Sequence, residues 1–207
     1  MPVLCRRVLI TAACSISASW ALAGCAGTPM VDPVYRRTEV QYATGEPPGT
    51  IVVNPPEHFL YFVQGGGRAL RYGVGVGGEG FAWSGLANVH DKQEWPDWYP
   101  TKDILQRNPR LRPDLIQLPG GLGIAGGRDN PLGARALYLW QGNKDTLYRI
   151  HGTNEPWTIG KNVSAGCIRM INEDVIDLYD RTPIGTKVAV LPSYVPSESY
   201  SIPHRDR

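Results

Sequence analysis

The chain has 207 residues, a formal net charge of +2 and a hydrophobic content of 42%. Its 21 lysines and arginines are balanced by 19 aspartates and glutamates, and no basic block interrupts the mixture of signs. Proteins that bind nucleic acid usually carry clustered basic residues, so this pattern argues against a nucleic-acid partner. The length suits one domain with a substantial core behind an N-terminal leader.

The N-terminus has the organisation of an export signal. Arg6 and Arg7 form a short basic start, and a mostly apolar run follows over residues 8–23. That run is too short and too loosely apolar for a good membrane span, so we expect residues 1–24 to be a signal peptide. Leu22-Ala23-Gly24-Cys25 resembles the lipobox of bacterial lipoproteins, which implies cleavage before Cys25 and a lipid anchor on that cysteine.

The lipobox resemblance also implies a location. An exported, lipid-anchored chain faces the periplasm, and Cys25 is followed by Ala26. The aspartate associated with retention in the inner membrane is therefore missing from that position, which favours the outer membrane of a Gram-negative cell.

The four cysteines leave one free thiol in the mature chain. Cys5 and Cys14 lie in the predicted signal peptide, and lipid would block Cys25, so Cys167 remains alone. It has no internal disulfide partner in a compartment that is expected to be oxidising. Such a thiol is either buried and inert or kept for its reactivity.

Three segments follow the predicted signal peptide. Residues 25–48 are polar and rich in turn-forming residues, so we expect a tether with partial order between residues 34 and 42. A catalytic domain is expected over residues 49–191. The Pro-, Ser- and Tyr-rich remainder, residues 192–207, is expected to be a loose tail.

The domain is predicted to be mostly β, a β-rich α+β fold with mixed β-sheets or a sandwich and a few short helices. The β-branched and apolar runs predict strands at residues 50–53, 58–63, 69–76, 135–140, 146–150 and 187–191. The first three of these would form an antiparallel meander. Short helices are predicted after Thr101 and after Asn172, each acting as the N-cap.

Two further stretches stand out by composition, and the second of them is predicted to be a loop. Residues 81–99 carry three of the six tryptophans among polar residues, and these aromatic rings either pack in the core or line a cleft. Residues 118–133 are rich in glycine and are expected at the edge of a cleft. Neither this loop nor the glycines at residues 73–78 have the pattern of a nucleotide-binding motif, so no nucleotide cofactor is expected.

The chemistry is expected between His151 and Cys167. His151 ends a predicted strand, and Cys167 follows a turn at Ser164-Ala165-Gly166, so a returning loop can bring the two together. A thiolate is a strong nucleophile, and an imidazole can generate it near neutral pH. Gly166 would let backbone N–H groups approach an acyl oxygen and form an oxyanion hole.

These residues resemble the signature of the L,D-transpeptidase catalytic domain (YkuD-like) family. That signature is His-Gly followed by Ser-His-Gly-Cys, a small apolar residue and often Arg. Residues 151–154, Ser164 and residues 166–169 match it. The resemblance extends to Asn130-Pro131-Leu132-Gly133 and covers about residues 49–191. Ala165 departs from it, because the family usually has histidine there. We expect Ala165 to tune the site without abolishing its chemistry, since the catalytic base aligns with His151.

The resemblance implies a substrate and a mechanism. Cys167 would attack the stem-peptide carbonyl of peptidoglycan, release the terminal D-alanine and form a thioester that an amine on a second stem, or on an outer-membrane protein, resolves. His151 would be the proton donor and acceptor, oriented by the Gly152 carbonyl. No metal or other cofactor is required. Residues with expected substrate contacts are Arg169, Ser164, Asn154 and Trp157.

Three alternatives remain open. Water in place of the amine would make the chain an L,D-carboxypeptidase or an enzyme that releases proteins from the wall. A lipoprotein that binds peptidoglycan without catalysis is a second alternative, which Ala165 favours. A metal site built from histidines and Cys167 is less favoured, because no two of these ligands have a metal-binding spacing.

Overall fold

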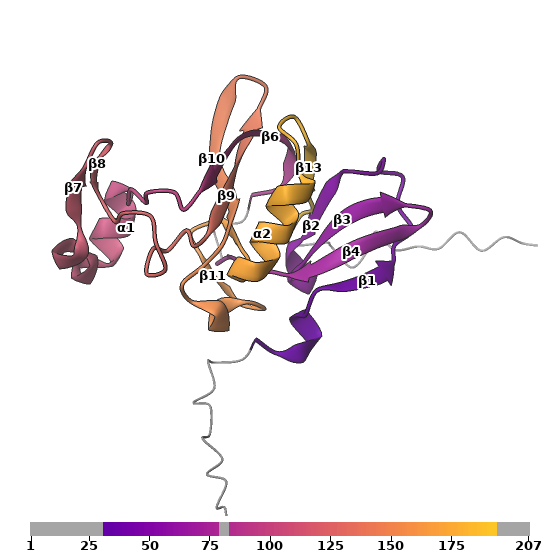
Figure 1. The fold of residues 1–207 in the computed structure, drawn as a ribbon, viewed down its shortest axis with the longest axis horizontal. Coiled ribbons are helices and arrows are strands. Elements are labelled where there is room, and N and C mark those ends of the chain that lie inside the picture. The colour runs from indigo at the N-terminus through magenta and orange to yellow at the C-terminus, as the bar shows by residue number, and fades with distance from the viewer. Residues whose placement is uncertain (1–30, 79–82, 194–207) are drawn as a thin grey trace, which may run out of the picture.

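A computed structural model describes residues 31–78 and 83–193 of the chain (Figure 1). The predicted signal peptide, Cys25 and the C-terminal tail from residue 194 onward lie outside the described residues. The described part is mostly β with few short helices, as the sequence predicts. Its strands are β1 Thr38–Gln41, β2 Ile51–Asn54, β3 Phe59–Gly65, β4 Arg68–Gly73, β5 Val76–Gly77, β6 Gly85–Glu94, β7 Ile116–Leu118, β8 Gly121–Gly123, β9 Arg135–Gln141, β10 Lys144–His151, β11 Asn162–Ser164, β12 Ile168–Arg169 and β13 Lys187–Val190.

Nine strands form one mixed sheet in the order β1-β4-β3-β2-β13-β6-β9-β10-β12. The predicted meander is confirmed, because β2, β3 and β4 pair antiparallel in sequence order. The predicted closing strand is confirmed as well. It becomes β13, which lies in the middle of the sheet, parallel to β2 and antiparallel to β6. Smaller sheets pair β11 with β5 and β7 with β8.

Strand β6 lies within the aromatic-rich stretch to which the sequence analysis assigned no strand. It is ten residues long and joins β13 to β9, and its buried residues, Ala87 and Val89, alternate with exposed ones. Both buried side chains are small, and the others include Asn88 and His90, so the apolar signal of this strand is weak. Both interpretations of the aromatic residues hold in part, since Trp83 packs on the core and Trp98 lines a cavity.

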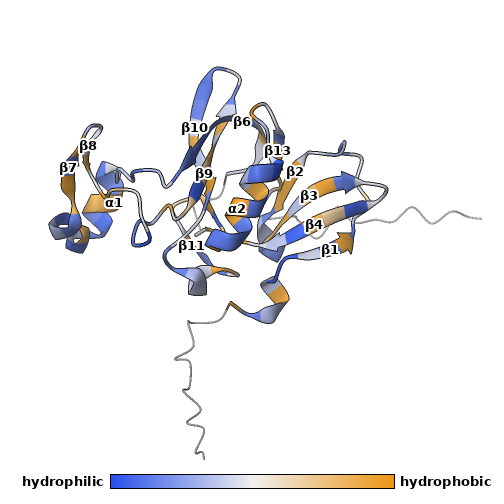
Figure 2. Cartoon of the chain, viewed as in Figure 1, coloured by the Kyte–Doolittle hydropathy of each residue, from blue (hydrophilic) through white to orange (hydrophobic). Residues whose placement is uncertain are grey.

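Helix α2 (Asn172–Arg181) packs its apolar side on the sheet. Val175 and Leu178 are fully buried in the main core, and Figure 2 shows apolar and polar residues alternating along this helix. The predicted N-cap at Asn172 is wrong. Ile171 occupies the cap position without a side-chain bond, because the Asn172 Oδ1 atom accepts a hydrogen bond from the Ala134 backbone N–H at 2.9 Å.

The segment before the sheet docks on α2. Its short helix η1 (Pro33–Tyr35) and β1 lie within the stretch where partial order was expected, and β1 pairs with β4. The Arg37 guanidinium lies 3.0 Å from Asp177 and 3.8 Å from the nearly buried Asp174. Asp177 also accepts a hydrogen bond of 2.6 Å from the Tyr72 hydroxyl, so one carboxylate ties β1, β4 and α2 together.

Asp174 gives the fold a specific pH dependence. Burial raises the pKa of its carboxyl group to about 6, although Arg37 opposes the shift. The unfolded chain releases this proton near pH 4, so between about pH 4 and 6 the native state binds more protons and loses stability as the pH rises. Asparagine does not ionise, so Asp174→Asn removes this loss of stability. The change that it makes in the free energy of unfolding should be about 2 kcal/mol more favourable at pH 7 than at pH 4.

Urea unfolding at the two pH values measures this difference. Asp180→Asn, which removes an exposed carboxylate from the same helix, is the control for a change in net charge. An equal effect of Asp174→Asn at both pH values would contradict the assignment.

A second, smaller group of elements projects from the sheet at the far left of Figure 1. It comprises helix α1 (Lys102–Arg107), the 3-10 helix η3 (Pro109–Asp114) and the β7–β8 hairpin. The predicted cap of α1 is confirmed, since the Thr101 Oγ1 atom accepts from the Ile104 N–H at 3.3 Å. The predicted glycine-rich loop over residues 118–133 begins within this hairpin, which the sequence analysis missed.

Candidate active site

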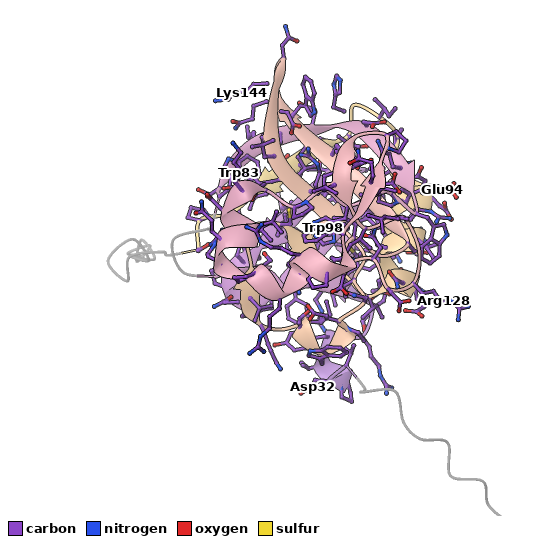
Figure 3. The ribbon with its side chains drawn as sticks, turned by 90° about the vertical axis from the view of Figure 1, so that its left-hand side faces the viewer. Asp32, Trp83, Glu94, Trp98, Arg128 and Lys144 are labelled. Carbon is purple, nitrogen blue, oxygen red and sulfur yellow. The ribbon has the colours of Figure 1, made fainter. Side chains whose placement is uncertain are left out.

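One cavity of about 600 Å³ lies between the sheet and the projecting group. In Figure 3, where α1 crosses the side turned toward the viewer, Trp98 lies near the middle of the molecule. The cavity wall carries both residues of the predicted pair, His151 and Cys167. The described residues that line it are Gly78, Trp98, Ile104, Arg107, Asn108, Leu111, Pro131, Leu132, His151, Asn154, Glu155, Asn162, Val163, Ser164, Ala165, Cys167 and Arg169.

His151 is held as a neutral imidazole. It is the last residue of β10 and is 4% exposed, and its Nδ1 atom lies 2.5 Å from the Gly152 carbonyl oxygen. Burial lowers the pKa of His151 to about 4 against the opposing effect of this hydrogen bond. A carbonyl only accepts, so Nδ1 carries the proton and Nε2 has the free lone pair.

Gly152 is required by its surroundings. A Cβ atom at this position would overlap the Asn172 Oδ1 atom and approach the Ala134 backbone nitrogen to 2.9 Å. The same Asn172 oxygen accepts the hydrogen bond from Ala134. Helix α2 and the start of β9 therefore enclose Gly152 and fix the carbonyl that faces the histidine ring.

A tight turn presents Cys167. The Ser164 hydroxyl donates to the Cys167 carbonyl at 2.6 Å and accepts from the Gly166 N–H at 3.1 Å. Gly166 has φ +113°, a conformation that favours glycine. Ser164, which was expected to contact substrate, is buried in this turn and also borders the cavity.

The turn leaves one backbone N–H free beside the sulfur. Gly166 was expected to let backbone N–H groups approach an acyl oxygen, and its own N–H is engaged by Ser164. Within residues 31–78 and 83–193, by contrast, the Cys167 N–H has no hydrogen-bond acceptor. The backbone donor beside the nucleophile is therefore that of Cys167 itself.

Burial raises the pKa of the Cys167 thiol. A hydrogen bond from the Arg149 main chain and the positive charges of Arg149 and Arg169 oppose this effect. With an imidazole whose pKa is lowered, the resting pair is a thiol and a neutral histidine instead of a thiolate and an imidazolium. An attack by this thiol would therefore require a base that accepts its proton.

Arg169 lies beside the histidine. It pairs in parallel register with His151 across β12 and β10, so the two side chains leave the same side of the sheet. Both line the cavity. The Arg169 Nη1 atom donates to the Glu155 carboxylate at 2.7 Å, so the residue expected to contact a stem carboxylate already has a carboxylate partner.

The other two residues expected to contact substrate, Asn154 and Trp157, differ in whether they line the cavity. Asn154 lines the cavity, and its Nδ2 atom donates to the Asp129 carbonyl at 2.8 Å, which ties the glycine-rich loop to the site. Trp157 does not line this cavity. It lies in the 3-10 helix η4 (Pro156–Thr158), and 47% of its surface is exposed.

Sequence reasoning missed the far wall of the cavity. Four of its residues come from the projecting group: Ile104, Arg107, Asn108 and Leu111. The helix containing Ile104 was predicted, but nothing in its local pattern indicates that it faces residues some fifty positions later. Within the described ranges, no group of three or more His, Cys, Asp or Glu side chains could hold a metal ion.

A neutral histidine and a thiol on one cavity are the groups that a cysteine-dependent acyltransferase requires. The family model described as the L,D-transpeptidase catalytic domain, YkuD, matches residues 48–190. The chain belongs to this family, whose members are cysteine-dependent acyltransferases.

Curated relatives agree with this family. The chain is 35% identical over 144 residues to the probable L,D-transpeptidase ErfK/SrfK of Salmonella typhimurium, an alignment that covers 68% of this chain and 43% of the relative. It is 36% identical over 141 residues to the probable L,D-transpeptidase YbiS of Escherichia coli, with 67% and 43% covered. The match thus spans less than half the length of these relatives.

A solved structure is more similar in sequence. A crystal structure from Brucella melitensis, described as a probable carnitine operon oxidoreductase caia, is 50% identical with a TM-score of 0.50. The alignment covers 78% of this chain and 96% of that one. The family model matches this chain to L,D-transpeptidases, so the oxidoreductase description remains a statement about that protein alone.

Proposed function

We propose that this chain is a peptidoglycan L,D-transpeptidase that forms a thioester on Cys167. One observation supports this most strongly. The buried His151 holds its Nδ1 proton against the Gly152 carbonyl, which leaves Nε2 as an acceptor in the cavity that Cys167 lines. Cys167 is also the one free cysteine in the part of the chain that the structure describes.

In the first half-reaction, Cys167 attacks the carbonyl of the third residue of a tetrapeptide stem. His151 takes the thiol proton as the C–S bond forms, and the Cys167 N–H donates to the developing oxyanion. Collapse of this intermediate breaks the C–N bond to the terminal D-alanine, which leaves with the proton from His151. The resulting thioester retains the acyl group in activated form, so no metal or nucleotide is needed.

In the second half-reaction, an amine attacks the thioester. The C–N bond forms, the C–S bond breaks, and His151 passes the amine proton to the departing sulfur. The acceptor is an amine on a second stem, which gives a 3-3 cross-link, or an amine on an outer-membrane protein. Water as the acceptor would give a shortened stem through the same two residues.

Incubation of the described domain with defined tetrapeptide muropeptides tests this function. We expect D-alanine release and a cross-linked dimer whose new bond joins the two third residues, identified by fragmentation mass spectrometry. A shortened tripeptide alone would identify a hydrolase. Saturable binding of muropeptides without D-alanine release would support the non-catalytic alternative and overturn the proposal.

We further propose that the chain is exported and anchored in a membrane by lipid on Cys25, facing the periplasm. The Leu22-Ala23-Gly24-Cys25 sequence supports this proposal. Among the described residues, no helix is long and apolar enough to cross a membrane. Such an anchor would keep the domain in the periplasm, close to the peptidoglycan that is its proposed substrate.

Substitution of the anchor cysteine tests this location. Cells that express Cys25→Ser are expected to incorporate no labelled palmitate into the protein and to release it into the soluble periplasmic fraction. The unsubstituted protein should carry the label and sediment with membranes. Label on the Cys25→Ser protein, or an unlabelled native protein, would contradict a lipid anchor at this residue.

A further inference from the structure

The second half-reaction places a requirement on the cavity. The acceptor amine reaches the enzyme mostly as an ammonium ion at neutral pH, since primary amines of this kind have a pKa near 10. A cavity that carries only positive charge would repel that ion. An acceptor subsite therefore needs a carboxylate close to the thioester.

Glu155 meets this requirement. Among the described residues that line the cavity it is the one acidic side chain, and the cations there are Arg107 and Arg169. Its side chain is 43% exposed, and its Oε2 atom accepts a hydrogen bond of 2.7 Å from Arg169. One carboxylate oxygen is thus fixed, while the carboxylate remains open toward the cavity.

The Arg169 contact ties this carboxylate to the strand that pairs with the His151 strand. Arg169 lies opposite His151 in the parallel pairing of β12 with β10, and neighbouring strands are about 4.8 Å apart. Arg169 also follows Cys167 by two residues. Glu155, His151 and Cys167 also line the same cavity, so an ammonium held by Glu155 shares that cavity with the base and with the thioester.

We propose that Glu155 binds the cationic amine of the acyl acceptor and so selects it over water, with Arg169 as the positioning residue for this carboxylate. This inference rests on the proposed transpeptidase function. In the transfer step the bound ammonium first loses a proton to solvent, and the neutral amine then attacks the thioester carbon. The C–N bond forms, the C–S bond breaks, and His151 passes the second amine proton to the departing sulfur. The carboxylate of Glu155 remains unchanged throughout and makes no covalent bond.

Glu155→Gln tests the inference, because glutamine keeps the shape and the hydrogen-bond acceptor for Arg169 but removes the charge. The thioester is first formed with a tetrapeptide donor, and its resolution is then followed with either a stem peptide that carries an ammonium or hydroxylamine, which is uncharged at neutral pH. We expect the variant to resolve the thioester with the ammonium acceptor about five- to tenfold more slowly. Resolution by hydroxylamine and the rate of thioester formation should stay within twofold.

Glu39→Gln is the matched control, since Glu39 forms an exposed 2.9 Å pair with Arg68 away from the cavity. It should leave both acceptors unaffected. Equal resolution by native and Glu155→Gln proteins would overturn the inference, and so would an equal loss with both acceptors, which would indicate a structural role. If the native protein forms no thioester at all, the proposed function fails instead.

Discussion

Replacing Cys167 with alanine is expected to abolish both thioester formation and D-alanine release from tetrapeptide stems. The reason is that Cys167 is the one free cysteine in the described ranges and lies on the cavity that contains His151. Without the sulfur, the first half-reaction has no nucleophile, and loss of such a group typically lowers the rate by several orders of magnitude. D-alanine release, measured by a coupled oxidase assay, follows this step directly.

The Cys167→Ala protein must fold for this result to be informative. Cys167 is only partly buried, and the turn around it is held by backbone and Ser164 atoms that alanine retains. Its urea midpoint should therefore stay close to that of the native protein. D-alanine release at the native rate by this folded variant would show that another group attacks the stem.

The second large effect is expected for His151→Gln. This variant cannot accept the thiol proton, and a positioned general base contributes about 10² to 10⁴ to the rate. The defect should appear in both half-reactions, because each one moves a proton through the same Nε2 atom. Stopped-flow measurement of acylation and of amine transfer separates the two steps.

The pH profile distinguishes this role from a structural one. Burial lowers the pKa of His151 to about 4, so the neutral imidazole that accepts a proton persists down to that pH. The acid limb of kcat/KM for the native protein should therefore lie near pH 4 instead of near the ordinary histidine value of about 6.5. The His151→Gln variant should lack this limb, and an acid limb at pH 6.5 in the native protein would contradict a buried neutral base.

Local sequence patterns predicted six of the nine strands of the main sheet, and the reason lies in their composition. The runs at residues 50–53 and 187–191 are β-branched and alternate little, as buried strands do, and both lie in the centre of the sheet. Strand β6 lacked that signal, because its two buried residues are an alanine and a single valine. Its place between β13 and β9 is set by tertiary pairing.

The cap of α2 failed for a related reason. Asn172 is a good N-cap residue by type, but its side-chain oxygen accepts from Ala134 across the structure, and that partner is 38 residues away. Sequence spacing does not reveal a competing long-range donor. The same oxygen closes the space around Gly152, so a wrong local prediction marks a residue that supports the site.

The residues of the candidate site also differ in whether local sequence could identify them. His151 and Cys167 could be singled out because their chemistry is rare and their turn residues are local in sequence. Glu155 and Arg107 could not, because their importance depends on which elements face each other across the cavity. Trp157 was wrongly expected to contact substrate. It is near His151 in the sequence but does not line the cavity.

The most direct test of the account is the mass of the trapped intermediate. Native protein mixed with a tetrapeptide stem and quenched in acid should gain the mass of the donor less D-alanine, and proteolysis should place that mass on the peptide that contains Cys167. We expect this adduct to form and to be lost on treatment with hydroxylamine. An unmodified Cys167 peptide during active turnover, or an adduct on another residue, would contradict it.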